Sequence, residues 1–437
     1  MNCEALREFR QQAYKMLGPA KDATFELMDA VMTTPRANCL TEMALNPLFR
    51  RQWSSVSEAL QDCQPDREQL MKLYLQQMSG VERPILAVDH TAWARPDAPT
   101  LRERTYEHQA TAIHGNKPIA IGLGYSTIAW IPEAQGSWAL PLRHERITSW
   151  DTPISQAAWQ LEQVIVGLPQ RPLVLFDREY GCASLVLQTA HLKADKLIRL
   201  RSNRCLYSAP PAYSGRGRPR SHGKKFQLND PQTWWAGEEM VELDDPKLGQ
   251  LQIRRWDNLH FRSSAEHPMT LILVERKALG SNCRQVKPLW LAWIGEGENS
   301  CSLEVVWIDY LRRFAIEHWY RLAKQTLHWT LPHLSTPEQC DRWSDLMPLL
   351  TWQLWLAQDL VRDYHLPWQK PLTNLTPGRV AQSLFPLLVK IGTPAVAPKP
   401  RGKSPGWPTG QSRIGRIRYP VVKKGRGQFQ NHRNLTS

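Results

Sequence analysis

Four side chains that could bind phosphate groups or a metal ion lie on one face of a helix expected between residues 309 and 329. They are Tyr310, Arg313, Glu317 and Lys324, at relative offsets of zero, three, seven and fourteen residues. At roughly 100° per helical residue, all four project from one arc about 60° wide. A carboxylate held beside a guanidinium and an ammonium favours a site for a metal ion and phosphate groups. A solvated helix face with ordinary charge pairs is the alternative, and this helix alone does not decide between the two.

The same helix is expected to bury an apolar stripe. On the helical wheel this stripe contains Leu311, Phe314, Ala315 and Leu322. Ser302 is a suitable N-cap, and the helix should end before Pro332. Arg321 and His328 fall on or beside the charged arc and extend the candidate binding surface.

Two aspartates can act as partners for Glu317. Asp89 directly follows the apolar run 85–88, and Asp177 directly follows the apolar run 173–176. A single aspartate after a strand is more often a helix cap or a turn former. Two of them at matching strand ends, with a glutamate on a later helix, favour a shared site. Three such carboxylates bind two divalent cations, with Mg²⁺ as the expected ion and Mn²⁺ as a substitute.

The order of elements predicts the fold that brings these aspartates together. Strands at 119–131 and 137–147 follow the first aspartate, and a helix at 154–166 precedes the second. A helix at 185–192 and a strand from residue 197 come next. This order resembles an RNase H-like fold, in which the ends of the first and fourth strands lie side by side. The predicted fold class is therefore α/β, with an RNase H-like core interrupted by a β-strand insertion.

Charge is concentrated at the carboxyl end of the chain. The formal net charge is +14, and from Leu366 onward there are 13 Lys and Arg residues and no Asp or Glu. Such a tail favours a polyanionic partner, in particular nucleic acid, and a solubilising tail is the alternative. An earlier basic loop contains Arg216, Arg218 and Arg220, whose guanidinium groups can follow a DNA minor groove. Flexible basic loops also occur on surfaces that bind nothing.

Six regions follow from these patterns. They are 1–80, a helical N-terminal domain that could bind DNA ends; 81–205, the first part of the core; 206–299, a β-rich insertion with the basic loop; 300–335, the helix that completes the core; 336–393, a C-terminal helical region; and 394–437, a basic tail expected to be disordered without DNA. A helix-turn-helix within the first region is a hypothesis without a turn signature to support it.

Composition excludes several classes of protein. With 437 residues and 42% hydrophobic residues, the chain can bury a large core. No apolar run approaches the roughly 20 residues of a membrane span, and the charged amino terminus is unlike a signal peptide, so a cytoplasmic, nucleoid-associated protein is expected. The eight cysteines have no C-x-x-C spacing and are interpreted as reduced thiols. A zinc site built from distant residues is the alternative.

The spacing Tyr310-x2-Arg313-x3-Glu317-x6-Lys324 resembles the YREK signature of cut-and-paste bacterial insertion-sequence DDE transposases. The resemblance covers about residues 80 to 330. It implies that Asp89, Asp177 and Glu317 are the metal ligands. It also implies that Arg313 and Lys324 contact phosphates near the cleaved DNA end, with Tyr310 supporting the same backbone.

The resemblance further implies how such a protein acts. Transposon ends at terminal inverted repeats are cut through a hairpin intermediate and joined to target DNA by a homodimer in a synaptic complex. A tryptophan of the insertion stacks on an extruded base, with Trp290 the best-placed match and Trp293 the second. A tryptophan on a strand is nevertheless more often part of a core.

One residue departs from the family pattern. Glu179 stands two residues after Asp177, where the family commonly has a small residue, so it could act as a neighbouring acid of the site. Two other functions stay open. One is a transposon-derived DNA-binding protein that does not cleave, and the other is an RNase H-like nuclease without strand transfer.

Overall fold

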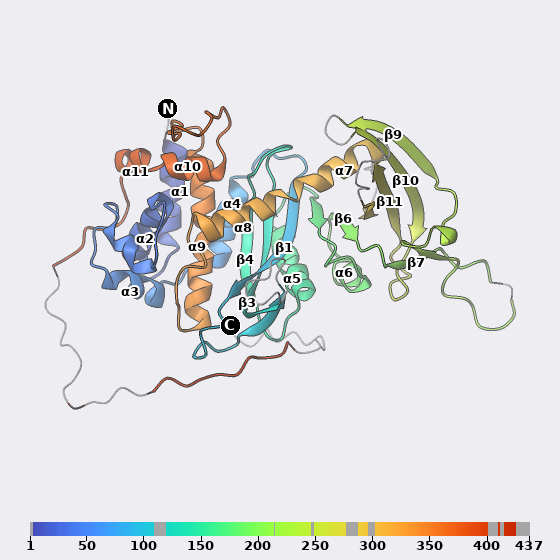
Figure 1. Ribbon diagram of the computed structural model, residues 1–437, viewed down its shortest axis with the longest axis horizontal. Coiled ribbons are helices and arrows are strands. Elements are labelled where there is room, and N and C mark those ends of the chain that lie inside the picture. Colours follow the sequence, from blue (N-terminus) through green and yellow to red (C-terminus); the bar gives the residue numbers. More distant parts are fainter. Residues whose placement is uncertain are drawn as a thin grey trace.

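A computed structural model describes residues 3–108, 119–213, 215–245, 249–276, 287–295, 302–400, 410 and 415–424. The chain is a mixed α/β protein with one large mixed sheet (Figure 1). Helices of the amino-terminal and carboxyl-terminal parts gather on one side of this sheet, and strands of the predicted insertion lie at its other end.

The centre of the sheet places the two strands that precede or carry the aspartates side by side, as the order of elements predicts. Strand β1 (Ile85–Ala94) pairs antiparallel with β3 (Ile119–Trp130), and β3 pairs antiparallel with β4 (Leu140–Ile147). On its other side β1 runs parallel to β5 (Leu173–Phe176), and β5 runs parallel to β6 (Asp195–Leu200). The resulting order β4-β3-β1-β5-β6 is consistent with an RNase H-like domain.

The predicted insertion continues the same sheet. Strand β12 (Leu289–Ile294) pairs antiparallel with β6, and β11 (Met269–Arg276), β10 (Gly249–Leu259) and β9 (Glu239–Asp245) follow outward. Strand β2 (Thr105–His108) pairs with the first residues of β3, inside a stretch that was expected to be a polar loop. The side chains of β2 alternate between buried and exposed, as in a strand, but they are polar. The composition therefore did not predict a strand here.

Helices flank the strands that carry the aspartates. Helix α5 (Pro153–Val166) packs on β1, β3 and β4, and it starts with a capping box between Thr152 and Ser155. Helix α6 (Ala183–Gln188) follows the second aspartate and packs against α5. Helices α7 (Leu303–Arg312) and α8 (Ala315–Gln325) come late in the chain, and α8 packs on β1.

The single helix expected from Ser302 to Pro332 is interrupted, which corrects the sequence prediction. At Arg313 and Phe314 the backbone forms hydrogen bonds to the third preceding residue, as in a tight 3₁₀-like turn. The second helix ends at Gln325, and the backbone then takes a positive φ of 55° at His328. The predicted apolar stripe holds only in part, because Phe314 is 38% exposed.

The helices outside the sheet surround one long helix. Helix α9 (Pro337–Ala357) is almost wholly buried and packs along β4. Around it lie α1 (Glu4–Lys15), α2 (Lys21–Thr33), α3 (Ser54–Asp62), α4 (Arg67–Gln76) and α10 (Pro377–Ser383). Short elements complete the described chain: η1 (Leu40–Leu45), β7 (Cys205–Tyr207), β8 (Lys225–Gln227), η2 (Pro231–Thr233) and α11 (Phe385–Ile391).

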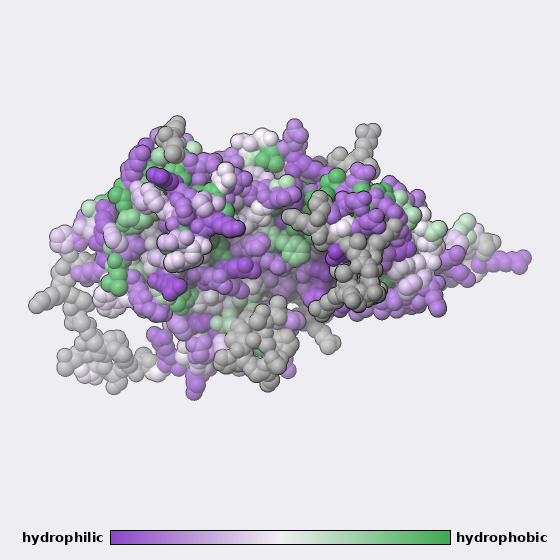
Figure 2. Space-filling model, turned by 45° about the horizontal axis from the view of Figure 1, so that its top comes forward, coloured by the Kyte–Doolittle hydropathy of each residue, from purple (hydrophilic) through white to green (hydrophobic). Residues whose placement is uncertain are grey.

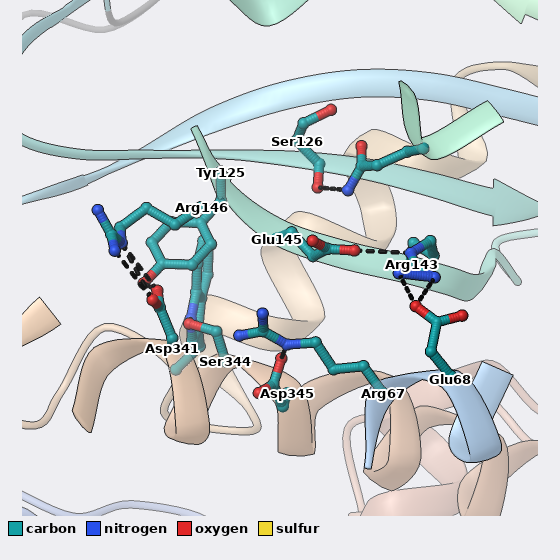
Figure 3. Close-up of polar contacts among 12 residues, drawn as sticks. Arg67, Glu68, Tyr125, Ser126, Arg143, Glu145, Arg146, Asp341, Ser344 and Asp345 are labelled. Atoms are coloured by element: carbon teal, nitrogen blue, oxygen red, sulfur yellow. Dashed lines mark hydrogen bonds and ion pairs between the residues drawn. The ribbon is translucent and has the colours of Figure 1, made fainter. Parts of the chain in front are cut away.

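A charged network fastens α4 and α9 to β4 (Figure 3). Arg67 on α4 binds Asp345 on α9 at 2.7 Å, and Arg146 on β4 binds Asp341 on α9 at 2.9 Å. The Tyr125 hydroxyl donates to the same Asp341 carboxylate at 3.2 Å. These contacts join the helical part of the chain to the sheet that carries the aspartates.

His144, on β4 beside this network, predicts a pH dependence of stability. Burial, with the charges of Lys324 and Arg67 adding to it, lowers the pKa of His144 to about 3. Below about pH 6.5 the unfolded chain therefore binds a proton that the folded chain excludes, so acid favours unfolding. We expect His144 to lower the free energy of unfolding by about 2 kcal/mol between about pH 7.5 and about pH 5.

The measurement is urea unfolding at both pH values for the wild type and for His144→Gln. The variant is expected to lose less stability over this interval than the wild type. Equal losses in the two proteins would show that His144 does not titrate as this environment requires.

Two stretches of the basic tail contact the core, and residues 401–409, 411–414 and 425–437 of the tail lie outside the described residues. Arg50 donates to the carbonyl of Ala395 at 2.8 Å, and the amide of Val396 donates to Asp22 at 2.9 Å. Residues 415–424 lie beside β2. The cysteines Cys39, Cys63, Cys182, Cys205 and Cys340 are free, and Cys283 and Cys301 lie outside the described residues.

The surface in Figure 2 is mainly hydrophilic, with apolar patches most evident over the helical part of the molecule. Within the described ranges, no helix has both the length and the apolar character that crossing a membrane requires.

Candidate active site

Strand register places Asp89 and Asp177 side by side. The parallel pairing of β1 and β5 ends with Val88 opposite Phe176, so the next residue on each strand is an aspartate. The charges of both carboxylates raise the pKa of Arg313, and the charge of Asp177 also raises the pKa of Asp89. Asp89 itself lies within β1 rather than at its end, because β1 continues along β3 with Asp89 opposite Thr127. The two aspartates therefore lie side by side because each one directly follows the last residue pair of the parallel pairing.

Arg313 joins Asp89 to Glu317. From the turn between α7 and α8, its guanidinium lies 3.4 Å from the Asp89 carboxylate and 2.6 Å from the Glu317 carboxylate. The arginine is 2% exposed. Although burial lowers its pKa, the neighbouring Tyr310 and the carboxylates hold the pKa of Arg313 above its ordinary value. The predicted grouping of Asp89, Arg313 and Glu317 is therefore present in the structure.

Lys324 lies on the same face of β1 as Asp89. Its ammonium donates to the Thr91 hydroxyl at 2.7 Å, and Thr91 follows Asp89 by two residues on the strand. Burial lowers the pKa of Lys324 to about 8, and the charge of Asp89 opposes this shift. Tyr310 differs from the expectation, because its ring is 1% exposed and belongs to the core.

The carboxylate pair fits a divalent cation. Oδ1 of Asp177 is buried and has no hydrogen-bond partner among the described residues. Burial raises the pKa of Asp89 to about 6, and the charges of Asp177 and Glu317 add to this rise while Arg313 opposes it. Buried anionic oxygens that lack a full set of partners are the ligands that Mg²⁺ prefers.

Glu317 is turned toward Arg313 in this arrangement. In the part of the chain that the structure describes, no three His, Cys, Asp or Glu side chains are grouped closely enough to hold a metal ion together. The Glu317 side chain is 51% exposed and can change rotamer. The geometry therefore places Asp89 beside Asp177 and leaves Glu317 paired with Arg313.

Glu179 contacts two arginines that are not among the predicted site residues. Its carboxylate is ion-paired with Arg201 and lies 3.8 Å from Arg178. Its side chain is 39% exposed. Glu179 therefore has ion-pair partners of its own, although only one residue lies between it and Asp177 in the chain.

Several predicted DNA-contact residues lie elsewhere. Trp290 is 1% exposed and packs against Trp234 and Trp256, so its covered ring is not placed to stack on a base. Trp293 is 9% exposed, with Arg83 over its ring at 5.7 Å.

His328 does not extend the charged surface, because it is buried and contacts the carbonyl of Thr34 at 2.8 Å. Arg321 is exposed on α8, as expected. The three arginines of the basic loop, Arg216, Arg218 and Arg220, are also exposed.

His90 and Tyr180 also belong to this region, although the sequence pattern did not predict their contact. The His90 ring nitrogen lies 3.2 Å from the Tyr180 hydroxyl, and Tyr180 closes a turn by donating its amide to the carbonyl of Asp177. This contact ties β1 to the turn that carries Asp177. In the sequence, the only sign of this contact is a tyrosine three residues after the aspartate. Without the register of the strands, that tyrosine cannot be assigned a partner.

The fold and the paired carboxylates define an α/β protein with an acidic site on a large mixed sheet. A family model described as DDE superfamily endonuclease matches residues 14–259, more than half of the chain, and the chain belongs to this family. The match includes Asp89 and Asp177 and ends before Glu317. No curated protein matches the chain. Membership supports an enzyme of the transposase or nuclease type that acts on DNA, and such endonucleases typically use divalent metal ions.

Proposed function

We propose that this protein is a DNA transposase, which cleaves the ends of a mobile element and joins them to target DNA. The observation that carries the proposal is the pairing of Asp89 with Asp177 beside Arg313 and Glu317. Acidic groups side by side with cationic groups suit a phosphodiester, because the acids hold cations while arginine and lysine bind phosphate oxygens. The family match supports the same chemistry independently.

In this proposal Asp89, Asp177 and Glu317 hold two Mg²⁺ ions, which Mn²⁺ can replace. When bound, these ions activate the attacking oxygen and stabilise the leaving oxygen of the phosphodiester. Arg313 moves from the carboxylates to a DNA phosphate, and Lys324 on the same face orients the neighbouring phosphate. The half-buried position of Lys324 strengthens such a contact, because water screens it less.

The finer steps of the proposal rest on the resemblance of the Tyr310, Arg313, Glu317 and Lys324 spacing to the YREK signature. They are recognition of terminal inverted repeats, a hairpin intermediate, and a homodimer that holds two ends together. Because Trp290 lies in a core, a base-contact role would require the strands around it to open.

Strand transfer distinguishes this function from its alternatives. Purified protein is incubated with labelled duplexes carrying an element end, a target plasmid and Mg²⁺, and the products are separated on a denaturing gel. Joined products are expected for a transposase. Cleavage without joining would identify a nuclease, which the family description as an endonuclease favours as the second candidate. Binding without cleavage would identify a DNA-binding protein that has lost its activity.

The basic loop predicts the salt dependence of DNA binding. Arg216, Arg218 and Arg220 are exposed, so replacing all three by alanine removes three phosphate contacts if they face DNA. We expect the slope of log K against log salt to become shallower by about 2 to 3. A matched triple variant at the exposed Lys193, Arg262 and Arg276 should leave this slope nearly unchanged. Equal effects of the two variants would show that the loop contributes only net charge.

A further inference from the structure

The C-terminal residues 415–424, here called the strap, lie along the free edge of the sheet at β2. The strap makes a parallel bridge between Val422 and Thr105, and the Val422 amide donates to the carbonyl of Arg104 at 2.7 Å. The Tyr419 amide donates to the carbonyl of Pro99 at 2.8 Å. Arg104 returns a hydrogen bond from its guanidinium to the carbonyl of Tyr419 at 3.2 Å. These bonds cover a strand edge that would otherwise expose unpaired backbone groups.

A buried carboxylate lies under the strap. Glu107 of β2 is 4% exposed, and its ion pair among the described residues is with Lys424, at 2.7 Å. The Thr105 hydroxyl donates to the same carboxylate. A carboxylate removed from water is costly unless a cation compensates it. The folded core therefore contains an acid whose partner comes from the far end of the chain.

Glycine at position 124 creates the space for this acid. A Cβ at Gly124 would lie 2.7 Å from Oε2 of Glu107, so the carboxylate rests directly on the β3 backbone. Gly124 is opposite Ala92 of β1, and Ser126 is opposite His90. The buried pair thus lies on the His90 face of β1, behind the face that carries Asp89. His90 in turn contacts Tyr180, next to the turn of Asp177.

We propose that the strap docks in cis on β2 as a built-in edge strand and that Lys424 is a positioning residue, which neutralises Glu107 and fixes the strap against β2 and β3. The occupant of this edge is the same chain, because its own segment supplies both the strand bonds and the matching charge. Lys423 is exposed and stays available to solvent or phosphate. This role goes beyond DNA cleavage and does not depend on it.

Amide hydrogen exchange of the full chain tests the proposal without any activity assay. Lys424→Met should speed exchange at the amides of Tyr419 and Val422 by at least about tenfold, because Glu107 loses its cation. The matched control Lys423→Met removes the same charge at an exposed position and should leave exchange within about threefold of the wild type. Lys424→Arg should preserve protection.

A second variant separates charge compensation from simple packing. Adding Glu107→Gln to Lys424→Met removes the uncompensated acid, so protection should return to within about threefold of the wild type. No recovery in the double variant would overturn the role of Lys424. Wild-type protection in the single variant would overturn it as well. Protection must also be independent of protein concentration, and its loss on dilution would assign the edge to the strap of a second copy instead.

Discussion

Replacing Asp89 or Asp177 by asparagine is expected to lower metal-dependent DNA cleavage by at least about 10³-fold while leaving the fold and DNA binding intact. The reason is that each change removes a charged ligand but keeps the shape of the side chain. Glu317→Gln is expected to have the same effect. Cleavage is measured on labelled duplexes with Mg²⁺, and circular dichroism and gel shifts report on fold and binding.

Glu179→Gln is the matched control for this prediction. It removes an acid two residues from Asp177, but that acid is exposed and paired with Arg201. Activity should stay within about threefold of the wild type. Cleavage at the wild-type rate by Asp89→Asn, Asp177→Asn or Glu317→Gln would contradict the assignment of that residue. A large loss of cleavage in Glu179→Gln would show that Glu179 belongs to the site.

Arg313→Met is expected to lower the free energy of unfolding by about 3 to 5 kcal/mol in the absence of divalent ions. The buried guanidinium compensates Asp89 and Glu317, and without it these acids and Asp177 repel one another. Adding Mg²⁺ should restore part of the lost stability, since a cation can replace the missing positive charge. Urea unfolding with and without Mg²⁺ measures both effects.

Arg312→Met is the matched control, because Arg312 is the neighbouring arginine but bonds to Asp309 and to the carbonyl of Ile131. Its effect should be smaller and independent of Mg²⁺. If Mg²⁺ stabilised both variants equally, the cation would be acting somewhere other than at the carboxylates beside Arg313.

The central strands and their aspartates could be predicted from the sequence for a physical reason. The runs 85–88 and 173–176 are short, apolar and end in an acid, and buried parallel strands have this composition. The order of the elements then allowed only a few topologies. The family match and the strand order agree with this interpretation.

Other features depended on contacts that a sequence does not display. A helical wheel assumes an unbroken helix, so it missed the turn at Arg313 and placed the buried His328 on the binding surface. Trp290 has the same sequence pattern whether it faces a base or a core, and its neighbours Trp234 and Trp256 are distant in the chain. Burial by residues far apart in sequence therefore set the limit of the prediction.

The tail shows the same limit. Its composition, rich in Pro, Gly, Lys and Arg, predicts disorder. Only the fold brings Lys424 to Glu107 and Ala395 to Arg50. A truncation after Pro367, which the charge pattern suggested as a test of DNA binding, would also remove the buried residues of α10 and α11. Point variants in the basic loop and strap are therefore cleaner tests.

Binding of Mn²⁺ to the purified protein tests the central claim most directly. Electron paramagnetic resonance counts the bound ions in the wild type, Asp177→Asn and Glu179→Gln. We predict that the wild type and Glu179→Gln bind Mn²⁺ alike and that Asp177→Asn loses most of this binding. Equal Mn²⁺ binding by Asp177→Asn and the wild type would contradict a metal site at the paired aspartates.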